Sequence, residues 1–348
     1  MNRRTLPLSA RARVGVSAFL VAVVTGAPHA WAQAAAGPTL AAVRARGVLE
    51  CSASLGTTGF GIYDRQGVFQ GMDADNCRAI AAAVLGEPKV RFNALSTPQR
   101  LTALQTGQVD VVIQTLTWTQ SREAANGLEF PLTYFYDGQS FLTRKSTNAK
   151  TGKDLAGAAI CTTQGSTSEL NLADWSRSSG TPMRPVVFER NVDALAAYES
   201  GRCDAYSTDA SQLASNRTAM RDPEEHMVLP DRISKEPLGP AVRKGDEQWL
   251  DIVKWTLYAL ITAEELGVTQ ANLDEMAKSP NPAIQRLLGV SGDHGKMMGL
   301  DNRWAYNAIK AVGNYGEIYD RHFGRIGLPR GPNNMWTQGG LLYAPPIR

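Results

Sequence analysis

The sequence feature that most constrains the fold is a unit that occurs twice. A helix ends at a glycine, a G-x-x-D segment follows, and a strand begins; the two copies are Gly107–Asp110 (G-Q-V-D) and Gly201–Asp204 (G-R-C-D). Five residues after each aspartate comes a polar side chain, Thr115 in one copy and Asp209 in the other. This internal repeat predicts two similar α/β lobes that present their strand ends to one another.

The polar segment Gln114–Arg122 (Q-T-L-T-W-T-Q-S-R) follows an apolar, β-branched run, Val109–Ile113, which we interpret as a buried parallel strand. Ligands of open α/β sheets bind at such strand ends. The hydroxyls of Thr115 and Thr117 can accept from an ammonium or donate to a carboxylate, and an arginine grips a carboxylate through two hydrogen bonds. The segment predicts a receptor for a small carboxylate. The alternative is a solvated loop whose arginine pairs with a neighbouring glutamate.

Further strands and helices follow from hydrophobic pattern, caps and glycine stops. Ser166 and Thr167 open a helix that runs to about residue 178, and helix N-termini favour anionic groups, although a plain N-cap is the alternative. The predicted strands are 47–54, 90–95, 109–113 and 158–162, with a hairpin closed by 67–71. The predicted helices are 73–85, one capped by Thr97 before Pro98, one capped by Asn191, 246–266 and 304–323, and the tail 328–348 is expected on the surface.

Two segments, 134–143 and 235–242, are predicted to pass between the lobes, so the second lobe is an insertion in the first. The predicted organisation is residues 33–137 with 238–348 as lobe 1 and residues 138–237 as lobe 2. Two crossing strands make a hinge. The expected fold class is therefore α/β, with two lobes, each a mixed sheet flanked by helices.

Residues 1–32 have the composition of an export signal, with four arginines, an uncharged apolar stretch and an A-x-A cleavage site at Ala30–Ala32. Removing them changes the formal net charge from +3 to −1, because four arginines and no acidic residue are lost. Nucleic acid is therefore not an expected partner. The remaining chain of roughly 316 residues is long enough for two lobes.

Four cysteines remain, which in an exported chain indicates two disulfides with three possible connectivities. The chain has neither a C-x-x-C motif nor a cysteine–histidine cluster, so neither a metal nor a cofactor is expected.

Several motifs resemble those of the solute-binding proteins of ABC transporters, family 3. G-M-D-A-D-N-C-R-A-I-A-A-A-V-L-G is similar to the first-helix signature of that family and A-L-Q-T-G-Q-V-D to the second. Q-G-S-T-S-E-L-N-L-A-D-W, K-E-P-L-G-P-A-V-R and A-V-G-N-Y-G-E-I-Y resemble the general L-amino-acid-binding subgroup. Residues from about 267 to 300 exceed the compact family pattern.

The resemblance implies a role for each polar residue of the motifs. Arg122 would hold the ligand α-carboxylate, helped by Thr117 and the backbone at Ser166 and Thr167. Asp209 would hold the α-ammonium, with Thr115 or Gln114. Thr57 stands where relatives often place an aromatic over the ligand side chain, and Phe60 or Trp118 is expected to supply that contact. Arg100 is the one charged residue that could face the ligand side chain, with a surface position as the alternative.

The implied function is a periplasmic receptor that binds several L-amino acids and delivers them to the membrane permease of an ABC transporter, as a monomer and without catalysis. The alternative is a periplasmic dehydratase on the same scaffold, acting on a cyclic acid, with Asp209 as general acid. Because a cross-link between lobes would prevent hinge motion, we predict disulfides within each lobe, joining Cys51 to Cys77 and Cys161 to Cys203.

Overall fold

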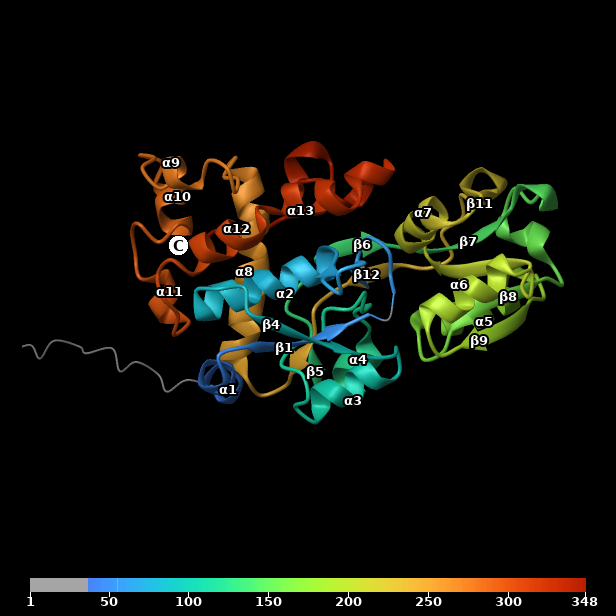
Figure 1. The fold of residues 1–348 in the computed structure, drawn as a ribbon, viewed down its shortest axis with the longest axis horizontal. Coiled ribbons are helices and arrows are strands. Elements are labelled where there is room, and N and C mark those ends of the chain that lie inside the picture. Colours follow the sequence, from blue (N-terminus) through green and yellow to red (C-terminus); the bar gives the residue numbers. More distant parts are fainter. Residues whose placement is uncertain (1–36, 55) are drawn as a thin grey trace, which may run out of the picture. The chain divides into compact units, whose positions relative to one another are not determined.

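The structure is a computed structural model that describes residues 37–54 and 56–348, so the predicted signal at 1–32 lies outside the described residues. The chain crosses between two groups of elements along β6 (Phe135–Asp137) and β12 (Glu236–Leu238), which pair antiparallel (Figure 1). Elements encoded between these strands form one group, and elements from both ends of the chain form the other. This is the two-lobed α/β architecture that the sequence predicted.

The group between the crossing strands is built on a five-stranded sheet of order β11-β7-β10-β8-β9. Strand β10 pairs parallel with β8 and antiparallel with β7, so the sheet is mixed, as predicted. Its elements are β7 (Gln139–Arg144), β8 (Ala159–Thr163), α5 (Thr167–Ser179), β9 (Arg184–Phe188), α6 (Asn191–Glu199), β10 (Ala205–Asp209), α7 (Ala210–Ala219) and β11 (His226–Val228).

Successive side chains of this sheet enter opposite cores, because side chains alternate between the two faces of a strand. Ile160 and Ala205 belong to the core that contains Leu172 of α5, whereas Cys161 and Tyr206 belong to the core formed with α6 and α7. Both faces of the sheet are therefore covered by helices (Figure 1).

The other group combines residues before β6 with residues after β12. The sheet is short here: β1 pairs parallel with β4, and β5 pairs antiparallel with β13. Its elements are α1 (Pro38–Arg46), β1 (Leu49–Ala53), the hairpin β2 (Ile62–Tyr63) and β3 (Phe69–Gln70), α2 (Met72–Leu85), β4 (Val90–Ala94), α3 (Gln99–Gln105), α4 (Gln120–Ala125), β5 (Leu128–Glu129), β13 (Val242–Arg243), α8 (Glu247–Glu265), α9 (Leu273–Met276), α10 (Pro282–Leu287), α11 (His294–Met297), α12 (Trp304–Val312) and α13 (Tyr315–His322).

The predicted strand 109–113 is only partly regular. Its residues are buried and extended beside β1, but they pair through isolated bridges, Cys51 with Val111 and Val112 with Ala241. Side chains replace part of the ladder, because Ser52 Oγ accepts from the Ile113 N–H at 3.1 Å. The position of the strand was predicted correctly, but its hydrogen bonds do not form the continuous ladder that a regular strand would have.

Three helix predictions were wrong in detail. The helix expected after Thr97 begins at Gln99 with no side-chain cap, and Asn191 is the first residue of α6 rather than its cap. The helix expected over 304–323 is two helices, since Gly313 has φ +84° and Asn314 caps α13. A positive φ is incompatible with a right-handed helix, so α12 ends at Gly313.

The helices α2, α8 and α12 share one hydrophobic core with β1, which is called the first core below. The C-terminal residues complete this core instead of only covering it. Leu273, Ile284, Leu287 and Leu300 of the segment 267–300 are buried, and so are Met335 and Leu342 of the tail, which was expected on the surface.

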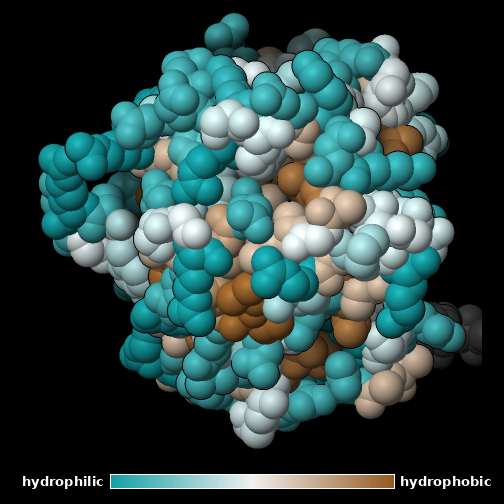
Figure 2. Space-filling model, turned by 90° about the vertical axis from the view of Figure 1, so that its right-hand side faces the viewer, coloured by the Kyte–Doolittle hydropathy of each residue, from teal (hydrophilic) through white to brown (hydrophobic). Residues whose placement is uncertain are grey.

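The two disulfides join Cys51 to Cys77 and Cys161 to Cys203, the pairs that the sequence predicted. Each disulfide lies within one group of elements. A disulfide that closes a loop of this length stabilises a protein by roughly 3 to 4 kcal/mol in the chain-entropy account. Within the described residues, no helix is both long and apolar enough to pass through a bilayer. On the face drawn in Figure 2 hydrophilic residues predominate and hydrophobic ones appear between them, as is usual for protein surfaces.

Candidate ligand-binding site between the two lobes

Arg122 lies on the short helix α4, which Thr119 caps by accepting from the Arg122 N–H at 3.3 Å. The side chain is 7% exposed, and its Nη1 donates to the carbonyl of Thr117 at 2.7 Å. Burial lowers the pKa of the guanidinium, and the nearby carboxylates of Glu236 and Asp209 oppose this shift. The solvated-loop alternative is therefore wrong: Arg122 is a buried cation that faces carboxylates of the other lobe and the crossing strand.

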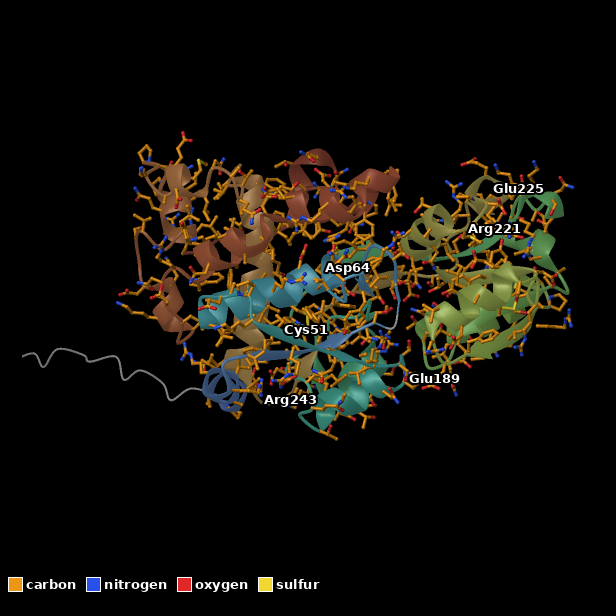
Figure 3. All side chains as sticks on the ribbon, viewed as in Figure 1. Cys51, Asp64, Glu189, Arg221, Glu225 and Arg243 are labelled. Carbon is orange, nitrogen blue, oxygen red and sulfur yellow. A yellow bond between two sulfur atoms is a disulfide. The ribbon has the colours of Figure 1, made fainter. Side chains whose placement is uncertain are left out.

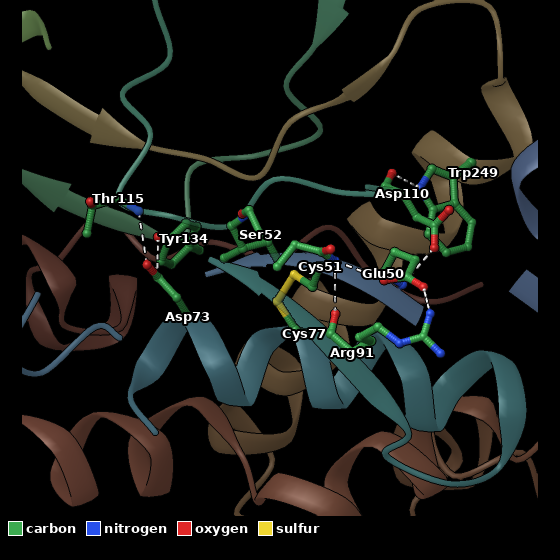
Figure 4. The surroundings of a disulfide bond; sticks show 12 residues. Glu50, Cys51, Ser52, Asp73, Cys77, Arg91, Asp110, Thr115, Tyr134 and Trp249 are labelled. Carbon is green, nitrogen blue, oxygen red and sulfur yellow. Dashed lines mark hydrogen bonds and ion pairs between the residues drawn. A yellow bond between two sulfur atoms is a disulfide. The ribbon is translucent and has the colours of Figure 1, made fainter. Parts of the chain in front are cut away.

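Thr115 has a backbone conformation that is unusual for a β-branched residue, with φ +43°. Its N–H donates to Asp73 Oδ2 at 2.9 Å, and the other oxygen of Asp73 accepts from the Tyr134 hydroxyl at 2.6 Å (Figure 4). Burial raises the pKa of Asp73 to about 7. The start of α2 thus fixes the segment that carries the predicted site residues.

Arg100 is buried, with 4% of its surface exposed, so its alternative position on the surface is wrong. Its Nη1 donates to the carbonyl of Gln114, whose own Nε2 donates to the carbonyl of Leu95 at 2.9 Å. Arg100 Nε and Gln114 Oε1 have no hydrogen-bond partner among the described residues. Burial and the neighbouring Arg122 lower the pKa of Arg100 to about 9. One donor and one acceptor are thus buried without hydrogen-bond partners.

Asp209 ends β10 and directly precedes α7, as the repeat predicted, and it is 6% exposed. Burial, together with the carboxylates of Asp137 and Glu236, raises its pKa well above the usual range. Asp137 accepts from the Gly138 N–H at 2.8 Å and from the hydroxyl of Ser211, and burial raises its pKa to about 6. The site therefore contains more carboxyl groups than the motifs indicated.

Glu236, at the start of β12, is the most connected carboxylate of the site and was not predicted. It is 1% exposed, and its Oε2 accepts from Thr117 Oγ1 at 2.5 Å and from Thr167 Oγ1 at 2.8 Å. The two hydroxyl oxygens lie 3.2 Å apart across the lobes. A resemblance to K-E-P-L-G-P-A-V-R marked this strand, but nothing in that pattern showed which way Glu236 points.

The remaining predicted residues have different surroundings. Ser166 caps α5 by accepting from the Glu169 N–H at 3.1 Å, so its hydroxyl has the ordinary capping role. Thr57 is fully buried and accepts from Asn191 Nδ2 at 3.1 Å, a contact between the lobes. Phe60 is fully buried in the first core, with its ring centroid 4.9 Å from that of Phe323. Trp118 is partly exposed beside the site.

Two cavities of the described residues have linings that include neither Arg122 nor Asp209. A groove of about 870 Å³ lies along the crossing strands and shares Trp118, Asp137 and Glu236 with the site, but neither Arg122 nor Asp209. A cavity of about 540 Å³ beside β11 is lined by charged residues that include Arg221 and Glu225 (Figure 3). The charged residues between the lobes are themselves buried, which leaves little open volume beside them. No group of residues suited to hold a metal ion occurs in the described part of the chain.

The chain is similar to several known binding proteins. The chain is 51% identical over 324 residues to the general L-amino acid-binding periplasmic protein AapJ of Rhizobium johnstonii, covering 91% of this chain and 95% of that protein. It is 48% identical to the glutamate/glutamine/aspartate/asparagine-binding protein BztA of Rhodobacter capsulatus, covering 95% of this chain and 98% of that protein.

A solved structure with the same fold is the ABC transporter periplasmic binding protein from Brucella ovis with glutathione bound. It is 47% identical to this chain, has a TM-score of 0.87, and the match covers 89% of this chain and 99% of that one. The sequence model of the bacterial extracellular solute-binding proteins, family 3, matches residues 51–271. The chain therefore belongs to the bacterial extracellular solute-binding proteins, family 3.

Proposed function

We propose that this chain is an exported receptor that binds L-amino acids and delivers them to the permease of an ABC transporter. The observation that carries the proposal is a pair of buried opposite charges on facing lobes, Arg122 and Asp209, which are 7% and 6% exposed. A zwitterion that leaves water needs both of its charges matched, because an unpaired buried charge is strongly penalised. An amino acid supplies that pair of charges.

In this proposal Arg122 holds the α-carboxylate together with the backbone of Ser166 and Thr167. Asp209 holds the α-ammonium, with Thr115 or Gln114 beside it. The raised pKa of Asp209 supports this role, since an ammonium close to the carboxylate removes the cost of its charge. Arg100 Nε and Gln114 Oε1, buried without partners, offer a donor and an acceptor to an acidic or amide side chain.

The lobes are proposed to be residues 33–137 with 238–348 and residues 138–237, with the paired strands β6 and β12 as the hinge. Closure of the lobes around a ligand creates one continuous docking surface for the permease, so the closed receptor is the transport-competent form. We propose that the receptor works as a monomer in the periplasm after the segment 1–32 directs its export.

The ligands of similar proteins support an amino-acid ligand of broad identity. AapJ is named for general L-amino acids, BztA for glutamate, glutamine, aspartate and asparagine, and the Brucella protein holds glutathione. Glutathione carries a free α-ammonium and a free α-carboxylate on its γ-glutamyl residue. All three ligand classes share the groups that Arg122 and Asp209 would match.

The test is a thermal-shift screen against the twenty L-amino acids, their D-enantiomers and glutathione, followed by titration calorimetry. We expect several L-amino acids to bind, with affinities within a few decades, because a pocket anchored at the α-carbon discriminates side chains by only about 1 to 3 kcal/mol per methylene. D-enantiomers are expected to fail. A response to one amino acid alone would replace broad by narrow specificity, and no response would refute the proposal.

One observation favours the dehydratase alternative: Asp209 has the raised pKa of a general acid. We propose that it is not one, because a receptor for an ammonium needs the same carboxylate and the similar proteins named above are binding proteins. Incubation with prephenate and with arogenate, followed by chromatography, tests this directly. Turnover of either acid that Asp209→Asn abolishes would favour the enzyme.

A further inference from the structure

Glu236 occupies an unusual position, because one buried carboxylate is shared by both lobes and by the strand that joins them. Oε2 accepts from Thr117 Oγ1 and Thr167 Oγ1, at 2.5 and 2.8 Å. Oε1 accepts from Ser234 Oγ and Asn171 Nδ2, both at 2.6 Å. Four donors thus satisfy a carboxylate that is 1% exposed. A buried charge with this many donors is stable without a salt bridge.

This arrangement fixes the direction of two hydroxyls at the centre of the proposed binding site. A threonine hydroxyl has one proton and two lone pairs. Thr117 and Thr167 each direct that proton to Glu236, so the rest of the site meets only their lone pairs. Both hydroxyls are therefore acceptors toward a ligand. They suit an ammonium and cannot donate to a carboxylate while Glu236 is charged.

We infer that Glu236 is a specificity-determining residue that selects ligands with an α-ammonium, by turning Thr117 and Thr167 into acceptors. It is a positioning residue, since it acts through the two hydroxyls. The inference rests on the proposed function and changes one of its parts: the side chain of Thr117, which the motif resemblance assigned to the α-carboxylate, faces the ammonium. The carboxylate is then left to the other N–H groups of Arg122 and to the backbone at the start of α5.

Substitution of Glu236 by glutamine tests the direction of the two hydroxyls, because glutamine has nearly the same volume and leaves no cavity. If the amide nitrogen of Glu236→Gln faces Thr117 and Thr167, its two N–H groups donate to both hydroxyls. Both threonine protons then turn toward the ligand, and the negative charge beside Arg122 is lost. Both changes favour a carboxylate ligand and disfavour an ammonium.

The experiment compares each amino acid with the 2-oxo acid of the same side chain by titration calorimetry, using L-glutamate with 2-oxoglutarate and L-alanine with pyruvate. The wild type is expected to prefer the amino acid in both pairs. In Glu236→Gln this preference should fall about tenfold or more, since a hydrogen bond to a charged group is worth about that factor in binding. A merely structural role would weaken both members of a pair equally and leave the ratio unchanged.

Glu224→Gln is the matched control, because it removes the same charge from the same lobe at a side chain that is 87% exposed. Its preference for the amino acid over the 2-oxo acid should equal that of the wild type. If Glu236→Gln does not fold, Thr167→Val is the second test. It removes one oriented hydroxyl and should lower the preference for the amino acid over its 2-oxo acid. Thr167→Ser keeps the hydroxyl and should keep this preference.

An unchanged ratio in folded Glu236→Gln, or in Thr167→Val, would overturn the inference and leave the proposed function intact. Failure of the wild type to bind any amino acid would instead overturn the proposed function, and this inference with it.

Discussion

Two guanidinium groups and three carboxylates meet where the lobes face each other, and their balance decides what the site can hold. Arg100 and Arg122 carry positive charge, and Asp137, Asp209 and Glu236 carry negative charge when ionised. Glu236 is satisfied by hydrogen bonds, whereas burial raises the pKa values of both aspartates. The aspartates are therefore the groups that gain most from a cation.

Truncation of either anchor should remove binding without unfolding the protein. Arg122→Ala and Asp209→Ala each leave one ligand charge buried and unpartnered, a loss of roughly 3 to 5 kcal/mol, or more than a hundredfold in affinity. Calorimetry with L-glutamate and a thermal melt of each variant measure the two quantities. Arg65→Ala, at an exposed arginine of the same lobe, should bind like the wild type. Affinity of Asp209→Ala within threefold of wild type would exclude the α-ammonium role.

Amino-acid affinity should fall as the solution is acidified. The free protein holds Asp209 with a raised pKa, while a bound ammonium favours its ionised form, so binding releases a proton at pH values below the pKa of the free protein. Affinity is then constant at high pH and declines by up to about tenfold per pH unit below that pKa. Titrations from pH 5 to 8 in two buffers of different ionisation enthalpy measure the released proton directly. A pH-independent affinity and zero proton release would contradict the assignment.

Sequence reasoning found the residues that belong to linear motifs and missed those defined by orientation. Arg122, Asp209 and the threonines follow strands at regular spacing, and the strand-end rule gathers them. Glu236 and Asp137 belong to crossing strands, where alternation decides the face of each side chain and one residue of register reverses it. Arg100 was undecided because a helix of seven residues gives a weak periodic signal.

At the scale of elements, the predicted helix boundaries were wrong where local polar groups competed with the helical pattern of apolar residues. The pattern over 304–323 is apolar at helical spacing throughout, yet Asn314 forms a capping box with Glu317 and begins a second helix. The N-x-x-E signature was present in the sequence, and the continuous apolar pattern outweighed it. By contrast α8, with its clear apolar face, was predicted to within one residue at each end.

The break between α12 and α13 gives a stability prediction. Asn314 is 5% exposed, accepts from the Glu317 N–H at 2.9 Å and donates to the carbonyl of Val268 at 2.9 Å. Asn314→Ala removes the cap and leaves a buried carbonyl unpaired, so the free energy of unfolding should decrease by about 2 to 3 kcal/mol. Urea unfolding measures it. Asn307→Ala, within α12 and partly exposed, should change stability by less than about 0.5 kcal/mol.

At the scale of the whole receptor, direct contacts between lobes should contribute to closure. Asn191 Nδ2 donates to Thr57 at 3.1 Å and its oxygen accepts from Thr163 at 2.6 Å, which joins α6 to the other lobe. A methyl group on Gly56 would lie 2.3 Å from Val192 of the same helix. The lobes thus approach each other closely at this edge.

Asn191→Ala should therefore weaken amino-acid binding without removing a group proposed to touch the ligand. The expected loss is about three- to tenfold, the usual contribution of one hydrogen bond. Calorimetry gives the affinity, and small-angle scattering gives the radius of gyration with and without L-glutamate. Glu189→Ala, at an exposed residue just before α6 (Figure 3), is the control. Unaltered affinity in Asn191→Ala would show that this contact does not stabilise the closed form.

The positions of the five-stranded sheet and of the first core along the chain also set an order of assembly. Every strand of the five-stranded sheet comes from residues 139–228, a continuous stretch, whereas the first core draws on residues from Leu40 to Leu342. A chain that is synthesised from its N-terminus can complete the inserted sheet early. The first core must wait for almost the last residue, and meanwhile α2 and β1 expose apolar surface. A C-terminal truncation that removes Met335 and Leu342 should therefore be most harmful to the core that contains β1 and α2, although these elements are synthesised first.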